Sequence, residues 1–155
     1  AMRNTSRRGD ITELEVMTAL ARRGGTLLRP VSNATRYDVL IDNEDGTFTR
    51  VQCKTGRLRR GCVVFGACSV SGHTTRHKRY HGQVDAFGVH CPQTGETYLV
   101  PMNELSSLTT VVYLRVVPAK NGQQRRVRLA AKYVIGGRPL SEGRGSPPGA
   151  TAPRP

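Results

Sequence analysis

Two extended segments joined by a turn constrain the fold of this 155-residue chain more than any other feature. Residues 38–42 read Asp-Val-Leu-Ile-Asp, residues 47–55 read Thr-Phe-Thr-Arg-Val-Gln-Cys-Lys-Thr, and the turn-forming sequence Asn-Glu-Asp-Gly lies between them. Apolar and β-branched residues on both sides of such a turn predict a hairpin of two antiparallel strands. We therefore expect Asp38, on the first strand, to lie near Gln52 and Lys54 on the second.

The alternation of side chains along a strand groups the polar residues of this hairpin. Gln52 and Lys54 are two positions apart and share one face, whereas Cys53 points the other way. A carboxylate, an amide oxygen and an ammonium group at one end of a sheet can hold a divalent metal ion and a phosphate together. The combination points to a nuclease, in which Lys54 orients or helps to deprotonate the attacking water.

Magnesium is the metal ion that this set of residues suggests, with Mn²⁺ able to replace it. Mg²⁺ prefers oxygen ligands and keeps several waters, so one or two carboxylates suffice. We expect its ligands to be Asp38, the amide oxygen of Gln52 and the backbone carbonyl of Cys53. Glu13, on the first predicted helix, is a further candidate, binding directly or through water, and Glu15 is its rival.

The rest of the chain predicts one helix followed by a body rich in strands. A capping box of Asp10 and Glu13 opens a helix over residues 10–23, and Ile11, Leu14 and Met17 share its apolar face with Leu20 and Ala21. Further strands are expected at 26–31, 62–70, 84–90, 98–101 and 110–117. Residues 56–61 read as a basic turn, 71–83 as a connection with partial helical character, 103–108 as a helical turn, and 125–133 as a strand followed by a short helix. This order predicts an α/β or α+β fold with a mixed central sheet.

The chain divides into a basic N-terminal arm at 1–8, one domain at 9–135 and a Gly/Pro/Arg-rich tail at 136–155 that we expect to be disordered. No apolar run is long enough for a membrane span, and the N-terminus lacks the apolar core of a signal peptide. The four cysteines match neither a zinc pattern nor a disulfide framework, so we expect free thiols. The prediction is an intracellular, cytoplasmic protein associated with the nucleoid.

Positive charge dominates the chain and is unevenly placed. The 24 Lys and Arg residues outnumber the 11 Asp and Glu residues, which gives a net charge of +13 and favours a nucleic-acid partner over a membrane. No acidic residue occurs between positions 46 and 84, and a stretch of one sign reads better as a phosphate track than as a solubility surface. The candidate DNA contacts are Arg36, Arg57, Arg59, Arg60, Arg76, Lys78 and Arg79.

Other polar residues of this basic region leave alternatives open. His73 and His77 stand four residues apart, but the surrounding Arg and Lys residues disfavour a zinc site. Cys53 paired with a histidine is conceivable as a nucleophile, although nothing in the sequence places the two together. Tyr80 and Asp85 flank a turn into a strand, where they either support the structure or contact DNA.

The order of these motifs resembles the PD-(D/E)xK nuclease superfamily. The resemblance rests on three segments in this order: Gly9-x-x-x-Glu13 on the first predicted helix, then Arg36-Tyr37-Asp38, then Gln52-Cys53-Lys54. Gln52 in place of the usual acid resembles the branch containing group I intron-encoded homing endonucleases, and segments 80–87, 91–101, 114–115 and 121–123 agree with that branch. The resemblance spans roughly residues 9–135.

This resemblance implies a restriction-endonuclease-like core with a mixed sheet flanked by helices, Mg²⁺-dependent cleavage of DNA, and a homodimer or higher homo-oligomer with one active site per strand. Holliday-junction resolvases share the fold, so a four-way junction is an alternative substrate. A non-catalytic DNA-binding protein, in which Gln52 marks the loss of activity, is the alternative of another class. Gln52 also removes one negative charge from the metal site and leaves the number of bound ions open.

Overall fold

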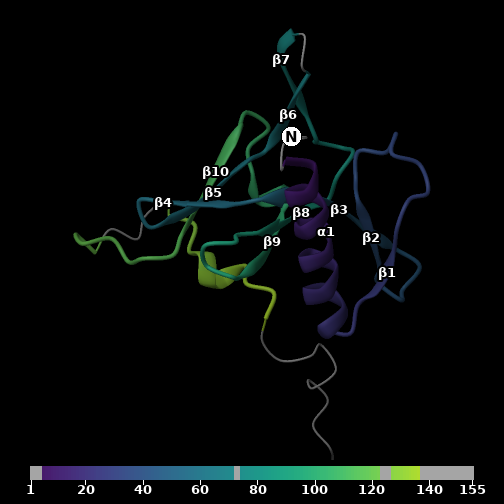
Figure 1. Ribbon diagram of the computed structural model, residues 1–155, viewed down its shortest axis with the longest axis horizontal. Helices are drawn as coiled ribbons and strands as arrows, with labels where there is room; N and C mark the ends of the chain where they lie inside the picture. Colours follow the sequence, from purple (N-terminus) through teal and green to yellow (C-terminus); the bar gives the residue numbers. More distant parts are fainter. Residues whose placement is uncertain (1–4, 72–73, 123–126, 137–155) are drawn as a thin grey trace, which may run out of the picture.

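The computed structural model describes residues 5–71, 74–122 and 127–136. In these residues one α-helix, α1 (Thr5–Arg22), lies across a five-stranded sheet, and two smaller sheets extend from it (Figure 1). The five-stranded sheet has the order β1 (Thr26–Leu28), β2 (Val39–Asp42), β3 (Phe48–Thr55), β8 (Ala86–His90) and β9 (Thr97–Pro101). Its β3–β8 pair is parallel and its other pairs are antiparallel, so the predicted mixed central sheet is confirmed.

The predicted hairpin is formed by β2 and β3. Val39 pairs with Val51 and Asp42 pairs with Phe48 in antiparallel register. The turn between the strands takes two residues into the left-handed region, Glu44 at φ 61° and Gly46 at φ 87°, a conformation that glycine adopts without a steric penalty. Because the register places Val51 opposite Val39, Asp38 lies beside Gln52 at the open end of the hairpin.

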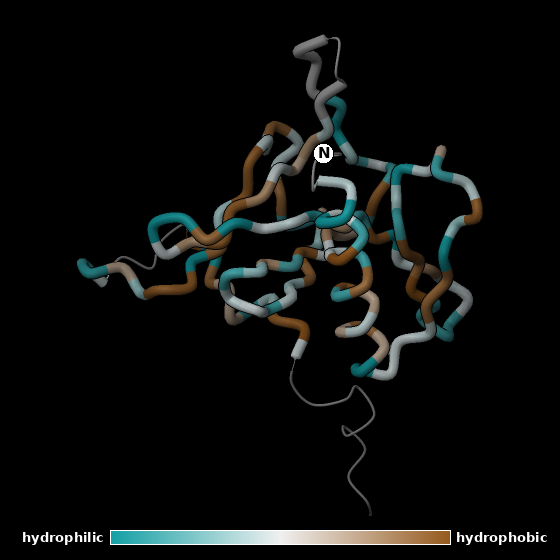
Figure 2. The backbone as a smooth tube through the Cα atoms, in the orientation of Figure 1, coloured by the Kyte–Doolittle hydropathy of each residue, from teal (hydrophilic) through white to brown (hydrophobic). Residues whose placement is uncertain are grey.

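Helix α1 differs from its prediction in both its start and its buried face. The helix begins at Thr5, so Asp10 lies inside it and the expected capping box is wrong, and residues 5–8 of the expected arm are helical. Its buried residues are Thr12, Val16 and Leu20, whereas Ile11 and Leu14 are 50% and 57% exposed. Figure 2 shows hydrophobic and hydrophilic colours alternating along this helix.

Close contact between α1 and the sheet explains why that face is buried. Gly88 on β8 lies directly under the helix, since a Cβ atom there would be 2.5 Å from Val16 Cγ1. Thr12 Oγ1 and Thr55 Oγ1 share a hydrogen bond of 2.6 Å that joins the helix to the end of β3. The threonine hydroxyl is therefore satisfied in the interface, which allows a polar residue to occupy the buried stripe.

The other face of the sheet is covered by a second sheet and not by helices, which corrects the expectation of flanking helices for the described residues. This three-stranded sheet has the order β10 (Val111–Arg115), β5 (Cys62–Gly66) and β4 (Arg57–Arg59). Val63, Phe65 and Leu114 from its inner face share a core with Phe87 and Val89 of β8. Strand β8 is buried along its whole length because its two faces pack on different layers.

Several predicted boundaries move in the structure. The expected basic turn at 56–61 contains strand β4, and the expected strand at 62–70 is divided at Ala67 into β5 and β6 (Cys68–Ser71). The expected helical connection at 71–83 contains strand β7 (Thr74–Arg79), which pairs with β6. Short 3-10 helices lie at Met102–Glu104 and Ala130–Lys132, near the predicted helical turns.

The remaining predictions concern the cysteines, the C-terminal tail and membrane-spanning segments. The four cysteines all lie in the described part of the chain and are thiols that no disulfide joins, as expected. The tail beyond residue 136, residues 123–126 and His73 lie outside the described residues. In the described part of the chain, no helix combines the length and the apolar character needed to cross a bilayer.

Candidate active site

Asp38 is fixed at the open end of the β2–β3 hairpin. Its backbone N–H donates to the carbonyl of Val51 at 2.9 Å, which anchors the residue just before β2 begins. Its Oδ2 atom accepts hydrogen bonds from Gln52 Nε2 at 2.7 Å and from the backbone N–H of Cys53 at 2.8 Å. Both bonds from the described residues go to the same oxygen, so Oδ1 is available to a ligand.

Gln52 acts as a hydrogen-bond donor to the carboxylate. Its Nε2 atom also donates to its neighbour, the carbonyl of Cys53, at 3.3 Å. This orientation satisfies the Asp38 carboxylate, which can only accept. A metal ion between Asp38 and Gln52 would require the amide to turn so that its oxygen faces the ion. The predicted role of the Gln52 oxygen as a ligand therefore stays a prediction.

The backbone carbonyl of Cys53 is directed toward the same end of the hairpin. Carbonyls two residues apart on a strand point to the same side. Since the Val51 carbonyl accepts the hydrogen bond from the Asp38 N–H on the β2 side, the Cys53 carbonyl points to that side too, past the residue where β2 starts. The Cys53 thiol faces the buried core beneath α1, and burial raises its pKa far above the usual range, which argues against a thiolate nucleophile.

Glu13 shares a cavity with Asp38, whereas Glu15 does not. A cavity of about 340 Å³ is lined by both Glu13 and Asp38, together with Asp10 and Arg29. Glu13 Oε2 accepts a hydrogen bond from Arg29 Nη2 at 3.0 Å. Glu15 lines a different cavity near the C-terminal end of α1. Of the two rival helix carboxylates, Glu13 is the one placed beside Asp38.

The carboxyl groups of Asp38 and Glu13 in this cavity are less acidic than usual. Burial raises the pKa of Asp38, which the Cys53 N–H, Lys54 and Arg29 only partly offset. Burial and the charge of Asp38 raise the pKa of Glu13, against the opposing effect of Arg29. Two neighbouring carboxylates that disfavour each other's charge form a site where a cation is stabilising.

Lys54 lies against Tyr80, a residue whose role the sequence left open. Lys54 Nζ donates to the Tyr80 hydroxyl at 3.1 Å and lies 4.7 Å from the centre of its ring. Arg36 Cζ lies 4.2 Å from the centre of the same ring. The ring is only 4% exposed and packs edge-on against Phe87. Tyr80 is thus a rigid support for the Lys54 ammonium group.

Asp85, the other residue left open, has a structural role. Its Oδ2 accepts from the backbone N–H and from Nε of Arg50 at 2.8 and 2.9 Å, and its Oδ1 accepts from Arg50 Nη2 at 2.9 Å. This pairing lowers the pKa of Asp85. The ion pair joins the starts of the parallel strands β3 and β8, away from the cavity that Asp38 lines.

The predicted DNA contacts fall into two groups. Arg36 is bound within the protein, since it donates to Gln83 Oε1 at 2.9 Å and to Ser69 Oγ at 3.1 Å. Arg57 and Arg59 project from β4, Arg60 from the turn after it, and Lys78 from β7. Arg79 of β7 is also exposed, but its Nη1 donates to the carbonyl of Ser107. Arg76 lies on β7, and its side chain lies outside the described part. The structure therefore brings Arg57, Arg59 and Arg60 together and places Lys78 and Arg79 on a separate hairpin.

A zinc site is not formed by the described residues. Residues 5–71, 74–122 and 127–136 contain no group of three or more His, Cys, Asp or Glu residues that could hold a metal ion. His90 is buried and bonds Thr97 Oγ1 through Nδ1 at 3.1 Å. Any metal at Asp38 therefore relies on carbonyl, amide or water ligands beside its carboxylates.

Comparisons with known proteins concern the family and the fold of the chain. The family model described as PD-(D/E)XK endonuclease matches residues 3–135. A solved structure titled as that of a bacterial homing endonuclease, I-Ssp6803I, is similar in fold, with 20% sequence identity, a TM-score of 0.67, and coverage of 85% of this chain and 89% of that chain. No curated protein matches the chain. Because the family model spans nearly all of the described residues, the chain belongs to the PD-(D/E)XK endonuclease family.

Proposed function

We propose that this protein is a divalent-metal-dependent DNA endonuclease that hydrolyses phosphodiester bonds in duplex DNA, in the manner of a homing endonuclease. The observation that carries the proposal is the meeting of Asp38, Gln52 and Lys54 at one end of the β2–β3 hairpin, with Glu13 in the adjoining cavity. Two further findings support the proposal: the chain belongs to a family of endonucleases, and its fold is similar to that of a homing endonuclease.

The residues at this end of the hairpin fit a hard divalent cation. Asp38 Oδ1, the Cys53 carbonyl and Glu13 offer oxygen atoms, which Mg²⁺ and Mn²⁺ prefer. Bound there, the ion would stabilise charge on the phosphoryl oxygen and lower the pKa of an attacking water. Gln52 keeps the Asp38 carboxylate in place through its 2.7 Å hydrogen bond and adds no further negative charge.

Lys54 performs the part of the chemistry that needs a positive charge. Its ammonium group is held by Tyr80 on the same strand face as Gln52, where it can orient the attacking water and offset the negative charge that builds on the phosphate. Arg29 neutralises part of the charge of Glu13. We assign Lys54 as the catalytic cation and Tyr80 as its positioning residue.

The substrate and the assembly follow from charge and symmetry. A net charge of +13 favours a polyanion, and the exposed arginines of β4 follow directly on the strand that carries Lys54. Cutting both strands of a duplex is simplest with two active sites related by a two-fold axis. We therefore propose a homodimer or higher homo-oligomer acting on DNA.

The test compares cleavage by the wild type, Lys54→Ala and Lys120→Ala. Lys120→Ala removes the same charge from an exposed position outside the site and serves as the matched control. Substrates are a pool of duplexes with a randomised central segment, from which cut ends are sequenced, and a four-way junction with arms of fixed sequence. Each is incubated with Mg²⁺, with Mn²⁺ and with EDTA.

The expected result is metal-dependent cutting at a restricted set of duplex sequences. Lys54→Ala should reduce cleavage by about 100- to 1000-fold, while DNA affinity changes little and the control cuts like the wild type. Symmetric cuts at the junction alone would replace this proposal with a resolvase. Tight, salt-sensitive binding without cutting of any substrate would leave a non-catalytic DNA-binding protein.

A further inference from the structure

The three-stranded sheet of β4, β5 and β10 has one face in the core and one face open. Val63, Phe65 and Leu114 point inward, so the alternate residues of these strands point outward. The register aligns Arg57, Val64 and Tyr113 in one row across the sheet. The next row contains Arg59, Cys62 and Arg115.

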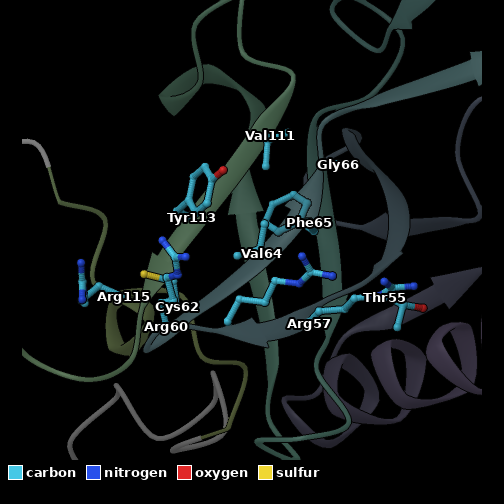
Figure 3. A pocket seen from close by; sticks show the side chains of 11 residues that line it. Thr55, Arg57, Arg60, Cys62, Val64, Phe65, Gly66, Val111, Tyr113 and Arg115 are labelled. Carbon is cyan, nitrogen blue, oxygen red and sulfur yellow. The ribbon is translucent and has the colours of Figure 1, made fainter.

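This open face is hollowed into a cavity of about 670 Å³ (Figure 3). Val111 and Tyr113 are 42% and 58% exposed, although both are large and partly or wholly apolar. Four arginines surround them, and none of the lining residues among the described part of the chain carries a carboxylate. The outward positions that line it are Arg57, Arg59, Cys62, Val64, Gly66, Val111, Tyr113 and Arg115. Arg60, Thr55 at the end of β3 and the largely buried Phe65 complete the lining.

The mixture of residue types distinguishes this face from a simple phosphate track. Phosphate binding needs positive charge or hydrogen-bond donors, which the Tyr113 hydroxyl can also supply, but it gains nothing from the exposed apolar side chain of Val111. Base edges in the major groove, in contrast, offer guanine acceptors for arginine and thymine methyl groups for apolar side chains. An ordinary solvated sheet face would also carry acidic residues among the basic ones. Arginine beside exposed apolar carbon therefore fits the edges of base pairs.

The position of the face relative to Lys54 is fixed by Gly56. A Cβ atom at Gly56 would lie 2.7 Å from Val63 Cγ1 and 3.0 Å from Val89 Cγ1, so the chain passes from β3 to β4 in tight contact with both sheets. At roughly 3.3 Å per residue, the chain from Lys54 spans at most about 10 Å to Arg57 and about 17 Å to Arg59. A duplex rises about 3.4 Å per base pair, so these upper limits equal about three to five base pairs.

We infer that the outer face of β4, β5 and β10 contacts base edges in the major groove of duplex DNA, within about five base pairs of the cleaved phosphate. A major groove about 12 Å wide admits a ribbon of two strands at about 4.8 Å spacing, and the long side chains of the third strand can reach in from its edge. The distance from the cut rests on the proposed nuclease function. Contact with the bases rests only on the residues of the face.

The test selects DNA sequences by binding, without cleavage. The full-length Lys54→Ala protein is the parent, and it is combined separately with Arg57→Ala, with Tyr113→Ala and with the control Arg22→Ala. Arg22 is exposed at the C-terminal end of α1, away from the three-stranded sheet. Each protein captures duplexes from a randomised pool, and bound sequences are compared by position. Circular dichroism checks that each variant is folded.

The parent and the Arg22→Ala control should select the same motif. Arg57→Ala and Tyr113→Ala should each lose preference at one to three adjacent positions by roughly 5- to 150-fold, the value of one good base contact. Tyr113→Ala removes no charge and should leave the salt dependence of binding unchanged. Cut ends mapped with the Lys54 protein should lie within about five base pairs of the affected positions.

Three results would overturn the inference. The first is a parent that binds DNA without any sequence preference, and the second is an unchanged motif in both variants. The third is a shift in oligomeric state with an unchanged motif, which would make the face an interface between copies of the chain. A motif altered as expected in a protein that never cuts DNA would support the inference while refuting the proposed nuclease.

Discussion

Gln52→Glu tests the most distinctive residue of the site, because it places a second carboxylate against Asp38. Gln52 Nε2 lies 2.7 Å from Asp38 Oδ2. The substitution removes a hydrogen bond to a charged group, worth about 1.5–3 kcal/mol. It also adds repulsion of about 4 kcal/mol between two charges roughly 4 Å apart at an effective dielectric constant of 20.

Protonation sets the upper limit of this destabilisation. Holding a proton on a glutamate at pH 7 costs roughly 4 kcal/mol, which is less than the combined loss above. The introduced carboxyl group should therefore take up a proton in the folded protein. It then donates a hydrogen bond to the Asp38 carboxylate. Its folded-state pKa is raised above its unfolded value, so the penalty is full near pH 7 and disappears as the pH falls toward the ordinary carboxylate range.

Thermal unfolding measured by circular dichroism, with and without Mg²⁺, is the assay. A loss of 3–4 kcal/mol should lower the melting temperature of a domain of this size by roughly 10 °C in EDTA at pH 7. Mg²⁺ should restore more stability to this variant than to the wild type, since the added carboxylate strengthens cation binding. Gln52→Ala removes the donor without adding charge, so its loss should be smaller and should shrink as falling pH protonates Asp38, and its stabilisation by Mg²⁺ should not exceed that of the wild type.

A Gln52→Glu protein as stable as the wild type at pH 7 in EDTA would refute the contact between Gln52 and Asp38. An equal response of the two proteins to Mg²⁺ would refute the assignment of this cavity end as the cation site. The two outcomes are independent, because the first measures the site without metal and the second measures the metal.

Four further predictions concern neighbouring groups. Glu13→Gln should weaken both Mg²⁺-dependent cleavage and stabilisation by Mg²⁺, whereas the matched Glu15→Gln should leave both unchanged, because only Glu13 shares the cavity of Asp38. Tyr80→Phe keeps the ring but removes the hydroxyl that holds Lys54 Nζ, so cleavage should fall about 2- to 10-fold and its pH profile should shift, with unchanged DNA affinity. Because the pKa values of Asp38 and Glu13 are raised, cleavage should be lost with falling pH earlier than exposed carboxylates would dictate. For the same reason Asp38→Asn should be more thermostable than the wild type at neutral pH, by a margin that shrinks as the pH falls.

The core of the site could be predicted because its geometry is local. Asp38, Gln52 and Lys54 lie at or beside two strands joined by a short turn. The alternation of side chains along a strand and the register between the two strands are enough to place them together. Tyr80 could not be assigned in this way. It reaches Lys54 through a hairpin that begins after β5, and a contact across 26 residues leaves no spacing signal in the sequence.

The errors in the helix have a comparable cause. Ile11 and Leu14 suggested an apolar stripe, but tertiary packing selected the stripe that contains Thr12. Its hydroxyl finds a partner in Thr55, and its neighbour Val16 fits over Gly88. Both conditions depend on residues of the sheet, which the periodicity of the helix alone cannot reveal.

Along β5 and β10, inward-facing and outward-facing side chains alternate. Neighbouring positions are therefore under different constraints during evolution. A change at Val63 or Leu114 alters the shared interior and threatens the whole molecule, whereas a change at Val64 or Tyr113 alters only the outer side. Descendants of such a chain can therefore change at Val64, Tyr113 and the other exposed outward positions without loss of folding. A combinatorial library confined to the outward positions of these two strands would preserve the architecture while diversifying the surface that it presents.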